Sequence, residues 1–179
     1  MFIDPNQMSE LLERLRRSND FRHSELNKQF GLDAVSGYQQ LLESPVPIAH
    51  GIPTLARGVY KNPSEMLKRR FEYAASWKDA ILGMRLLSIC EMETVWTNES
   101  ILKLIGIRQD TWLDSPPATI EWEEISLLAL DSVDGNEAYL VWKPSGVYPP
   151  SSEPEVVEFF GWDYNHFQSL GDFILYHCD

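Results

Sequence analysis

The stretch EPEVVEFFGWDYNHFQSLGDFIL, residues 153–175, carries the clearest secondary-structure signals in this chain. Its first part, Glu155 to Phe160, is rich in β-branched and aromatic residues, which favour a strand, and Gly161 ends it. Ser169, followed three residues later by an acidic residue, is typical of a helix capping box. We therefore expect a strand and then a closing helix, whose inward-facing residues are Phe167, Leu170, Phe173 and Ile174.

Two further strands are predicted upstream of this stretch. ISLLALD, residues 125–131, is an apolar run of strand length, and Asp134-Gly135 supplies the residues of a tight turn. EAYLVW, residues 137–142, is apolar on both faces and therefore suits a central strand. Because short, turn-rich links join the three segments, we expect them to be consecutive antiparallel neighbours.

The part of the chain before residue 112 is dominated by helical patterns. Asp4-Pro5 predicts a cap and a first helix with Met8 on its inward face, and residues 25–43 predict a second helical segment that breaks at Gly31. Asn62-Pro63-Ser64-Glu65 is typical of the start of a long helix. The inward face of that helix would hold Leu67, Phe71, Ala74, Ile81 and Met84.

A shorter helix is expected to open at Thr97 and to close at Gly106. Helices followed by a meander of strands and a final helix indicate the α+β class. The predicted fold is an antiparallel or mixed sheet in the C-terminal half, packed against helices, with a largely helical N-terminal half. A length of 179 residues suits a single domain, 1–179. Within it, residues 45–112 are a candidate helical insertion that begins with a segment rich in proline and glycine, and residues 113–179 form an acidic sheet-plus-helix portion.

The charge of the chain is distributed very unevenly. Residues 1–112 hold 14 basic and 14 acidic side chains, whereas residues 113–179 hold 13 acidic side chains and one basic residue, Lys143, so the net charge of −12 falls entirely in the last part. Such a surface would repel nucleic-acid phosphates, which argues against a nucleic-acid partner. It would attract a basic protein and speed the encounter with it. An acidic coat that only keeps the protein soluble is the competing interpretation.

The sequence offers no motif for catalysis, and we expect no catalytic residue, metal site or cofactor. It contains no glycine-rich phosphate loop, no G-x-S-x-G and no C-x-x-C. The two cysteines, Cys90 and Cys178, match no metal or redox spacing and suit free thiols in a reducing compartment. Neither a secretory signal nor an apolar run of membrane-spanning length is present. A cytoplasmic protein without a membrane partner is the expectation that follows.

Two parts of the sequence resemble the SUKH superfamily, which includes Smi/Knr-type cell-wall regulators and many bacterial toxin-immunity proteins. The first is the C-terminal stretch, where the matching positions are Val156, Val157, Phe159, Phe167, Leu170 and Phe173. The second is ELNKQFGLDAVSGYQQLLE, in which a Phe-Gly precedes a Tyr-x-x-Leu-Leu; the positions are Phe30, Gly31, Tyr38, Leu41 and Leu42. Together the similar pieces span residues 24–43 and 120–176, a little under half of the chain.

The resemblance implies an immunity protein that binds and neutralises a basic polymorphic toxin of the nuclease type. The acidic C-terminal surface would then be the contact surface, with aromatic side chains as its anchors. The expected partner-binding residues are Asp131, Asp134, Glu137, Tyr148, Glu153, Glu155, Glu158, Trp162, Asp163 and Tyr164. Three alternatives stay open: a regulatory adaptor of the cell-wall type, a small-molecule enzyme with a deep pocket, and simple core packing of the aromatic residues.

Overall fold

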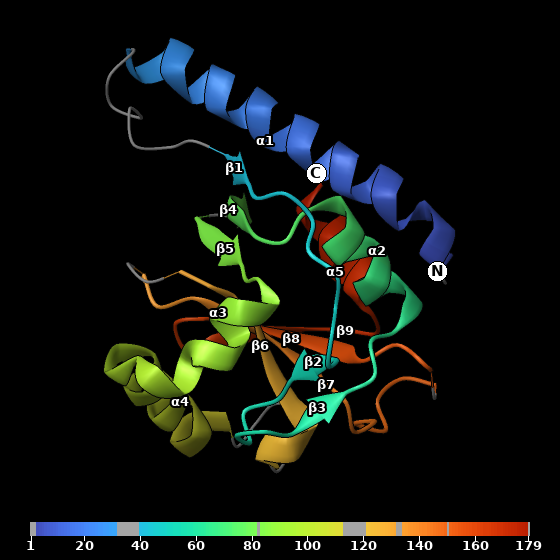
Figure 1. Ribbon diagram of the computed structural model, residues 1–179. Coiled ribbons are helices and arrows are strands. Elements are labelled where there is room, and N and C mark those ends of the chain that lie inside the picture. Colours follow the sequence, from blue (N-terminus) through green and yellow to red (C-terminus); the bar gives the residue numbers. More distant parts are fainter. Residues whose placement is uncertain are drawn as a thin grey trace.

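The protein has an α+β fold built on one antiparallel sheet of seven strands, which confirms the predicted fold class (Figure 1). This computed structural model describes residues 3–31, 40–81, 83–112, 121–131, 134–149 and 151–178. The strands lie across the sheet in the order β1 (Leu41–Leu42), β4 (Trp77–Ile81), β5 (Met84–Leu86), β6 (Ile125–Leu130), β7 (Glu137–Val141), β8 (Glu155–Phe160) and β9 (Asp163–Phe167). Every neighbouring pair is antiparallel.

The three strands expected from the C-terminal sequence are confirmed as consecutive antiparallel neighbours. Leu127 of β6 lies opposite Tyr139 of β7, which in turn lies opposite Val157 of β8. Both β7 and most of β8 are buried, as the two-sided apolar pattern of a central strand predicts. A fourth strand, β9, was not expected: it forms a hairpin with β8 and is the last strand of the sheet.

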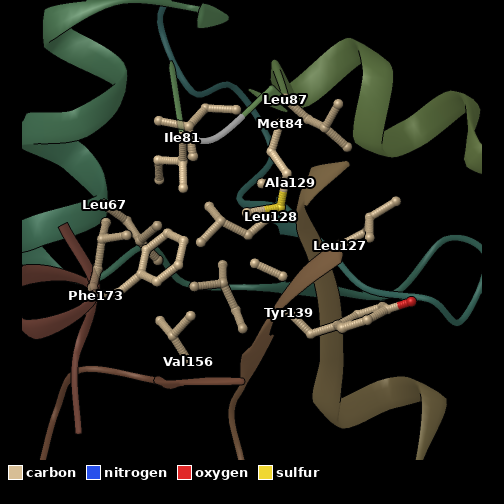
Figure 2. Packing of buried hydrophobic residues seen from close by; sticks show 14 of the residues in the cluster. Leu67, Ile81, Met84, Leu87, Leu127, Leu128, Ala129, Tyr139, Val156 and Phe173 are labelled. Carbon is tan, nitrogen blue, oxygen red and sulfur yellow. The ribbon is translucent and has the colours of Figure 1, made fainter. Parts of the chain in front are cut away.

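Helices cover both faces of this sheet. On one face lie α1 (Met8–Phe30), α2 (Glu65–Tyr73) and α5 (Leu170–His177), which pack on one another; Figure 2 shows Phe173 and Leu67 of this layer directed at Val156 and Leu128 of the sheet. The opposite face of β7 and β8 is met by α4 (Glu99–Thr111) and by Trp112, whose ring lies 4.7 Å from that of Phe159.

Short elements connect these layers. The small sheet pairs β2 (Ile52–Pro53) with β3 (Tyr60–Lys61), and α3 (Ile89–Glu93) leads into α4. The remaining pieces are the 3-10 turns η1 (Pro5–Gln7), η2 (Thr94–Thr97) and η4 (Trp122–Glu124). No helix within the described ranges has both the length and the apolar character needed to cross a membrane.

The predicted long helix after Ser64 is wrong beyond its first turns. The chain leaves the helix at Tyr73, forms β4, turns at Gly83 with a φ of 87°, and returns as β5. Such a φ suits glycine and is costly for other residues, so Gly83 favours a hairpin over a continuous helix. The five predicted inward residues are nevertheless buried. Because β4 and β5 belong to the main sheet, residues 45–112 are not a purely helical insertion.

Smaller corrections concern where helices end. The first helix runs unbroken to Phe30, and Leu26 and Phe30 are exposed at its far end instead of lying in a second helix. The predicted restart near residue 33 falls outside the described residues, while Leu41 and Leu42 form β1. Helix α4 starts one residue later than expected, with Asn98 as its cap, and passes through Gly106 without ending.

At the end of the chain Ser169 caps α5 as predicted, but Asp172 bonds to the Ser169 hydroxyl and not to its backbone N–H, so only half of the predicted capping box forms. Ser169 Oγ accepts a hydrogen bond from the backbone N–H of Asp172 at 3.2 Å and donates one to its carboxylate at 2.6 Å. Leu170, Phe173 and Ile174 are fully buried, as predicted. Phe167 belongs to β9 and not to the helix, and it packs its ring 5.4 Å from that of Phe173.

Candidate functional site

Most of the carboxylates predicted to form an acidic binding surface lie inside the protein. Of the seven acidic residues in the predicted set, only Asp134 and Asp163 are exposed. The other five are at most 6% exposed: Asp131, Glu137, Glu153, Glu155 and Glu158. Their expected exposure is therefore wrong, and a partner cannot reach most of them. A buried carboxylate needs donors around it, and each of the five has at least one.

The most deeply buried of these acids, Glu137, is paired with Arg108 of α4. Burial raises the pKa of the Glu137 carboxyl, and the hydrogen bond and charge of Arg108 act in the opposite direction. The Arg108 guanidinium also lies over the ring of Phe159, 4.1 Å from its centre, and donates to the carbonyl of Gly161 at 3.2 Å. One arginine thus ties α4 to the turn between β8 and β9.

Glu155 and Glu158 lie three residues apart in β8, so their side chains point to opposite faces of the sheet. On the α4 side, Glu155 Oε2 lies 2.8 Å from Nε2 of His166. On the α5 side, Glu158 Oε1 lies 2.9 Å from Nε2 of His177, and its Oε2 accepts a hydrogen bond from Nδ2 of Asn165 at 3.1 Å. Glu155 and Glu158 therefore each have a histidine at ion-pair distance.

Tyr148 holds the loop before β8 against β9. Its hydroxyl donates to the backbone carbonyl of His166 at 2.6 Å, and the two rings lie 4.9 Å apart. Burial is the largest cause of a raised pKa for this hydroxyl, and the charge of Glu155 adds to it. Tyr148 is half-buried and already engaged, so its predicted role as an exposed aromatic anchor is not supported.

The last two buried acids stabilise local backbone. Glu153 accepts a hydrogen bond at 3.2 Å from the N–H of Met66, in the first turn of α2, where the helix dipole favours a negative charge. Asp131 accepts one at 3.3 Å from the N–H of Asp134 at the β6–β7 turn. A side chain at Gly83 would meet the Asp131 carboxylate at 3.3 Å, so this acid also lies against the β4–β5 turn.

Three predicted residues, Trp162 in the β8–β9 turn and Asp163 and Tyr164 at the start of β9, are exposed. We call Phe160, Trp162, Asp163 and Tyr164 the β8–β9 tip. Trp162 is 85% exposed, Phe160 41% and Tyr164 38%. Within the described part of the chain, Trp162 has no hydrogen bond and no ring contact. Gly161, held by Arg108, fixes the backbone beneath it, while the rings of Phe159 and Tyr164 lie 6.2 Å apart.

Depressions also occur on the surface away from the β8–β9 tip. A cleft of about 660 Å³ lies between the β4–β5 hairpin and the start of α4, with Asp79, Arg85 and Asn98 on its walls. A second, mostly apolar groove of about 540 Å³ runs along residues 45–48 beside Phe71. No group of three or more metal-ligating side chains occurs among the described residues.

Several residues around the tip were missed by the sequence argument. Arg108 and His177 were given no role there, although they pair with Glu137 and Glu158. Their partners are 29 and 19 residues away in the chain, so no local pattern connects them. One signal was available: the three-residue spacing of Glu155 and Glu158 in a strand indicates two faces, and hence two separate environments.

Comparison with known proteins adds no relative to this picture. No family model matches the sequence, and neither the curated proteins nor the solved structures that were compared with it give a match.

Proposed function

We propose that this protein is a non-enzymatic binding protein, an immunity protein that neutralises a basic toxin, and that it contacts the toxin through the β8–β9 tip. The observation that carries the proposal is the 85% exposure of Trp162 on a turn whose backbone is held by the hydrogen bond from Arg108 to the carbonyl of Gly161. The resemblance to SUKH-superfamily immunity proteins supplies the type of partner.

The tip has the composition of a binding hot spot. Tryptophan and tyrosine dominate the energetics of protein interfaces, because they bury a large area at a low cost in side-chain entropy. Trp162 is exposed in the turn, with Phe160 exposed on one face of the hairpin and Tyr164 on the other, so the tip presents aromatic surface on both sides. The anchoring of Gly161 by Arg108 reduces the ordering cost of binding, since the turn is already in place.

Fewer exposed acids are available to attract a basic partner than the sequence alone suggests. Since five of the predicted acids are buried, attraction of a basic partner would rest on the overall charge of −12 and on exposed acids such as Asp163 and Asp134. A net field of one sign speeds the encounter even where the charges are dispersed. Specific contact is then made by the aromatic residues of the tip and by Asp163, which lies between Trp162 and Tyr164.

The test is protection from a toxin encoded beside this gene. The toxin domain alone should arrest growth, and co-expression of the wild-type chain should restore it. Trp162→Ala should lose protection and weaken binding of the purified toxin domain by roughly 30-fold or more, the size of a hot-spot effect. Its thermal unfolding should stay close to that of the wild type, because a side chain 85% exposed contributes little to folding.

Phe21→Ala is the matched control for this experiment. Phe21 is an aromatic residue 66% exposed on α1, far from the tip in the chain. It should protect as the wild type does. If Trp162→Ala protected equally well, the tip would not be the contact surface. If the wild type bound a cell-wall regulatory protein and no toxin, the adaptor function would replace the immunity function.

A further inference from the structure

A small cavity of about 170 Å³ lies beside the β8–β9 tip, on the face of the sheet that α5 covers. Its deepest charged group is the Glu158 carboxylate, which is 3% exposed. At its rim are two aromatic side chains, Phe160 from β8 and Tyr176 from α5, which are 41% and 58% exposed. The cavity therefore joins a buried negative charge to solvent between two rings.

Apart from His177, no basic side chain lies at ion-pair distance from the Glu158 carboxylate within the described part of the chain. Asn165 donates a neutral hydrogen bond to Oε2. His177 Nε2 lies 2.9 Å from Oε1, but it is not aligned for a hydrogen bond with that oxygen. Arg22 donates a hydrogen bond to the backbone carbonyl of His177 at 2.9 Å and is not among the residues that line the cavity. Asp163 adds a second acid close to the rim, since it pairs across the hairpin with Phe160 and shares its face.

We propose that this cavity takes the cationic end of a lysine or arginine side chain presented by the partner protein. An ammonium or guanidinium group can lie against aromatic faces while its charge meets a carboxylate. The methylene stem of either residue would contact the two rings at the rim. A volume of about 170 Å³ suits one side-chain end, since sites for whole drug-sized ligands are larger, from about 300 Å³ upward.

This inference rests on the proposed function and gives the partner a defined chemistry. Phe160 belongs both to the β8–β9 tip and to the rim of the cavity, so the two sites are continuous. A matching partner surface would have an apolar depression for Trp162 and a basic residue next to it. One basic side chain of the toxin would then bind at Glu158, and a broad acidic surface would not be needed for its recognition.

The cavity can be tested without knowing the partner. The probe is n-butylammonium, titrated into the full chain at low salt and followed by NMR at the Asn165 side-chain amide and the rings of Phe160 and Tyr176. Saturable shifts at these signals are expected, with a midpoint on the order of 10 mM for so small a probe. The matched control is n-butanol, which has the same stem and no charge. Equal shifts with both probes, or none with n-butylammonium, would overturn the proposal.

Glu158→Gln is the decisive variant, because it keeps the size of the side chain and an acceptor for Asn165 while removing the charge. It should abolish the n-butylammonium shifts. Tyr176→Ala changes an exposed residue and should weaken them severalfold, which keeps the test valid if Glu158→Gln folds poorly. Unchanged titrations in both variants would contradict the site.

The same variants separate this inference from the proposed function. If toxin binding requires Trp162 but is unaffected by Glu158→Gln and Tyr176→Ala, the interface stands and the cation site does not. If n-butylammonium binds as expected but no toxin does, the cavity stands and the immunity function fails.

Discussion

Strand β8 and the turn that follows it distribute their residues in opposite ways. In and just before the strand, the charged residues Glu153, Glu155 and Glu158 are at most 6% exposed. In the turn, the large aromatic residue Trp162 is 85% exposed. Residue type alone would predict the reverse. The difference shows that what a side chain meets at its position, and not its polarity alone, decides whether it lies inside.

The side chains of the two regions differ in whether they have partners within the chain. Each glutamate of β8 is held by donors from within the chain, so removing a donor would leave a buried charge uncompensated. Trp162 has no such internal partner among the described residues, so its contact area stays available to another molecule. Variants of the interior should therefore change stability, and variants of the tip should change binding.

The largest stability effect is expected at Phe173, which lies fully buried against the sheet. Phe173→Ala should lower the free energy of unfolding by roughly 3–5 kcal/mol, as other large-to-small changes in a packed core do. Phe160→Ala is the matched variant, because it removes the same side chain from a position 41% exposed, and it should cost about 1 kcal/mol or less. Urea unfolding measures both. Equal losses would contradict the contrast between interior and tip.

The sequence identified the elements whose signals are local. The strand-length apolar runs gave β6, β7 and β8, and the serine at position 169 gave the start of α5. The segment after Tyr73 was misassigned because Ala74, Ile81 and Met84 fit a helical face as well as they fit two short strands. The glycine at position 83 was the available sequence signal, because glycine weakens a helix interior and tolerates the positive φ of a hairpin turn. In the structure its φ is 87°.

The site was harder to predict because burial of a charge depends on distant partners. Nothing near Glu137 in the sequence indicates that Arg108 will neutralise it, and the high density of acids suggested an exposed surface instead. Trp162, Asp163 and Tyr164 are exposed, as a partner-binding role requires, but only Trp162 lies in the turn after Gly161, and the other two begin the unexpected strand β9. Asn165 and Tyr176 belong to the cavity only through the way β9 and α5 pack.

A smaller effect is expected from breaking one interior ion pair. Arg108→Ala leaves Glu137 at 0% exposure without its cation and should cost about 3 kcal/mol at pH 7. Lys143→Ala, which breaks an exposed pair with Glu121, should leave the free energy of unfolding close to that of the wild type. Both values come from urea unfolding. Similar losses in the two variants would mean that burial adds nothing to the Arg108–Glu137 pair.

The pH dependence of Arg108→Ala gives a second check. Burial raises the pKa of Glu137, and the hydrogen bond and charge of Arg108 oppose that rise. In Arg108→Ala this opposition is lost, so the pKa of Glu137 should rise further. A carboxyl whose pKa is higher in the folded state favours folding below its unfolded pKa, and this contribution is lost as the pH rises through the folded value. The deficit of Arg108→Ala relative to the wild type should therefore shrink as the pH falls from 7 toward 5. A constant deficit would indicate lost packing and not an uncompensated charge.

Among the interior variants the smallest effect at pH 7, and the only one with a stabilising sign, is expected at Tyr139 of β7. Its side chain is 1% exposed and packs against Trp112 and Phe159, and its hydroxyl has no hydrogen-bond partner among the described residues. Figure 2 shows that hydroxyl pointing away from the aliphatic side chains of the core. Because an unsatisfied buried hydroxyl is unfavourable, Tyr139→Phe should raise the free energy of unfolding at pH 7 by up to about 1 kcal/mol. A loss of more than about 1 kcal/mol would show that the hydroxyl is satisfied.

The gain from Tyr139→Phe should widen in alkali. Burial raises the pKa of Tyr139 well above 10, and the charge of Glu137 adds to the rise. The unfolded chain ionises this group near pH 10, whereas the folded chain keeps it neutral, so the wild type loses stability above that pH. The loss approaches about 1.4 kcal/mol per pH unit once the unfolded chain is fully ionised, and the variant escapes it. Urea unfolding at pH 7, 10 and 11 measures the difference. A gap that stays constant from pH 7 to 11 would mean that Tyr139 ionises equally in both states, and the interior around β7 would then be less well sealed than its burial indicates.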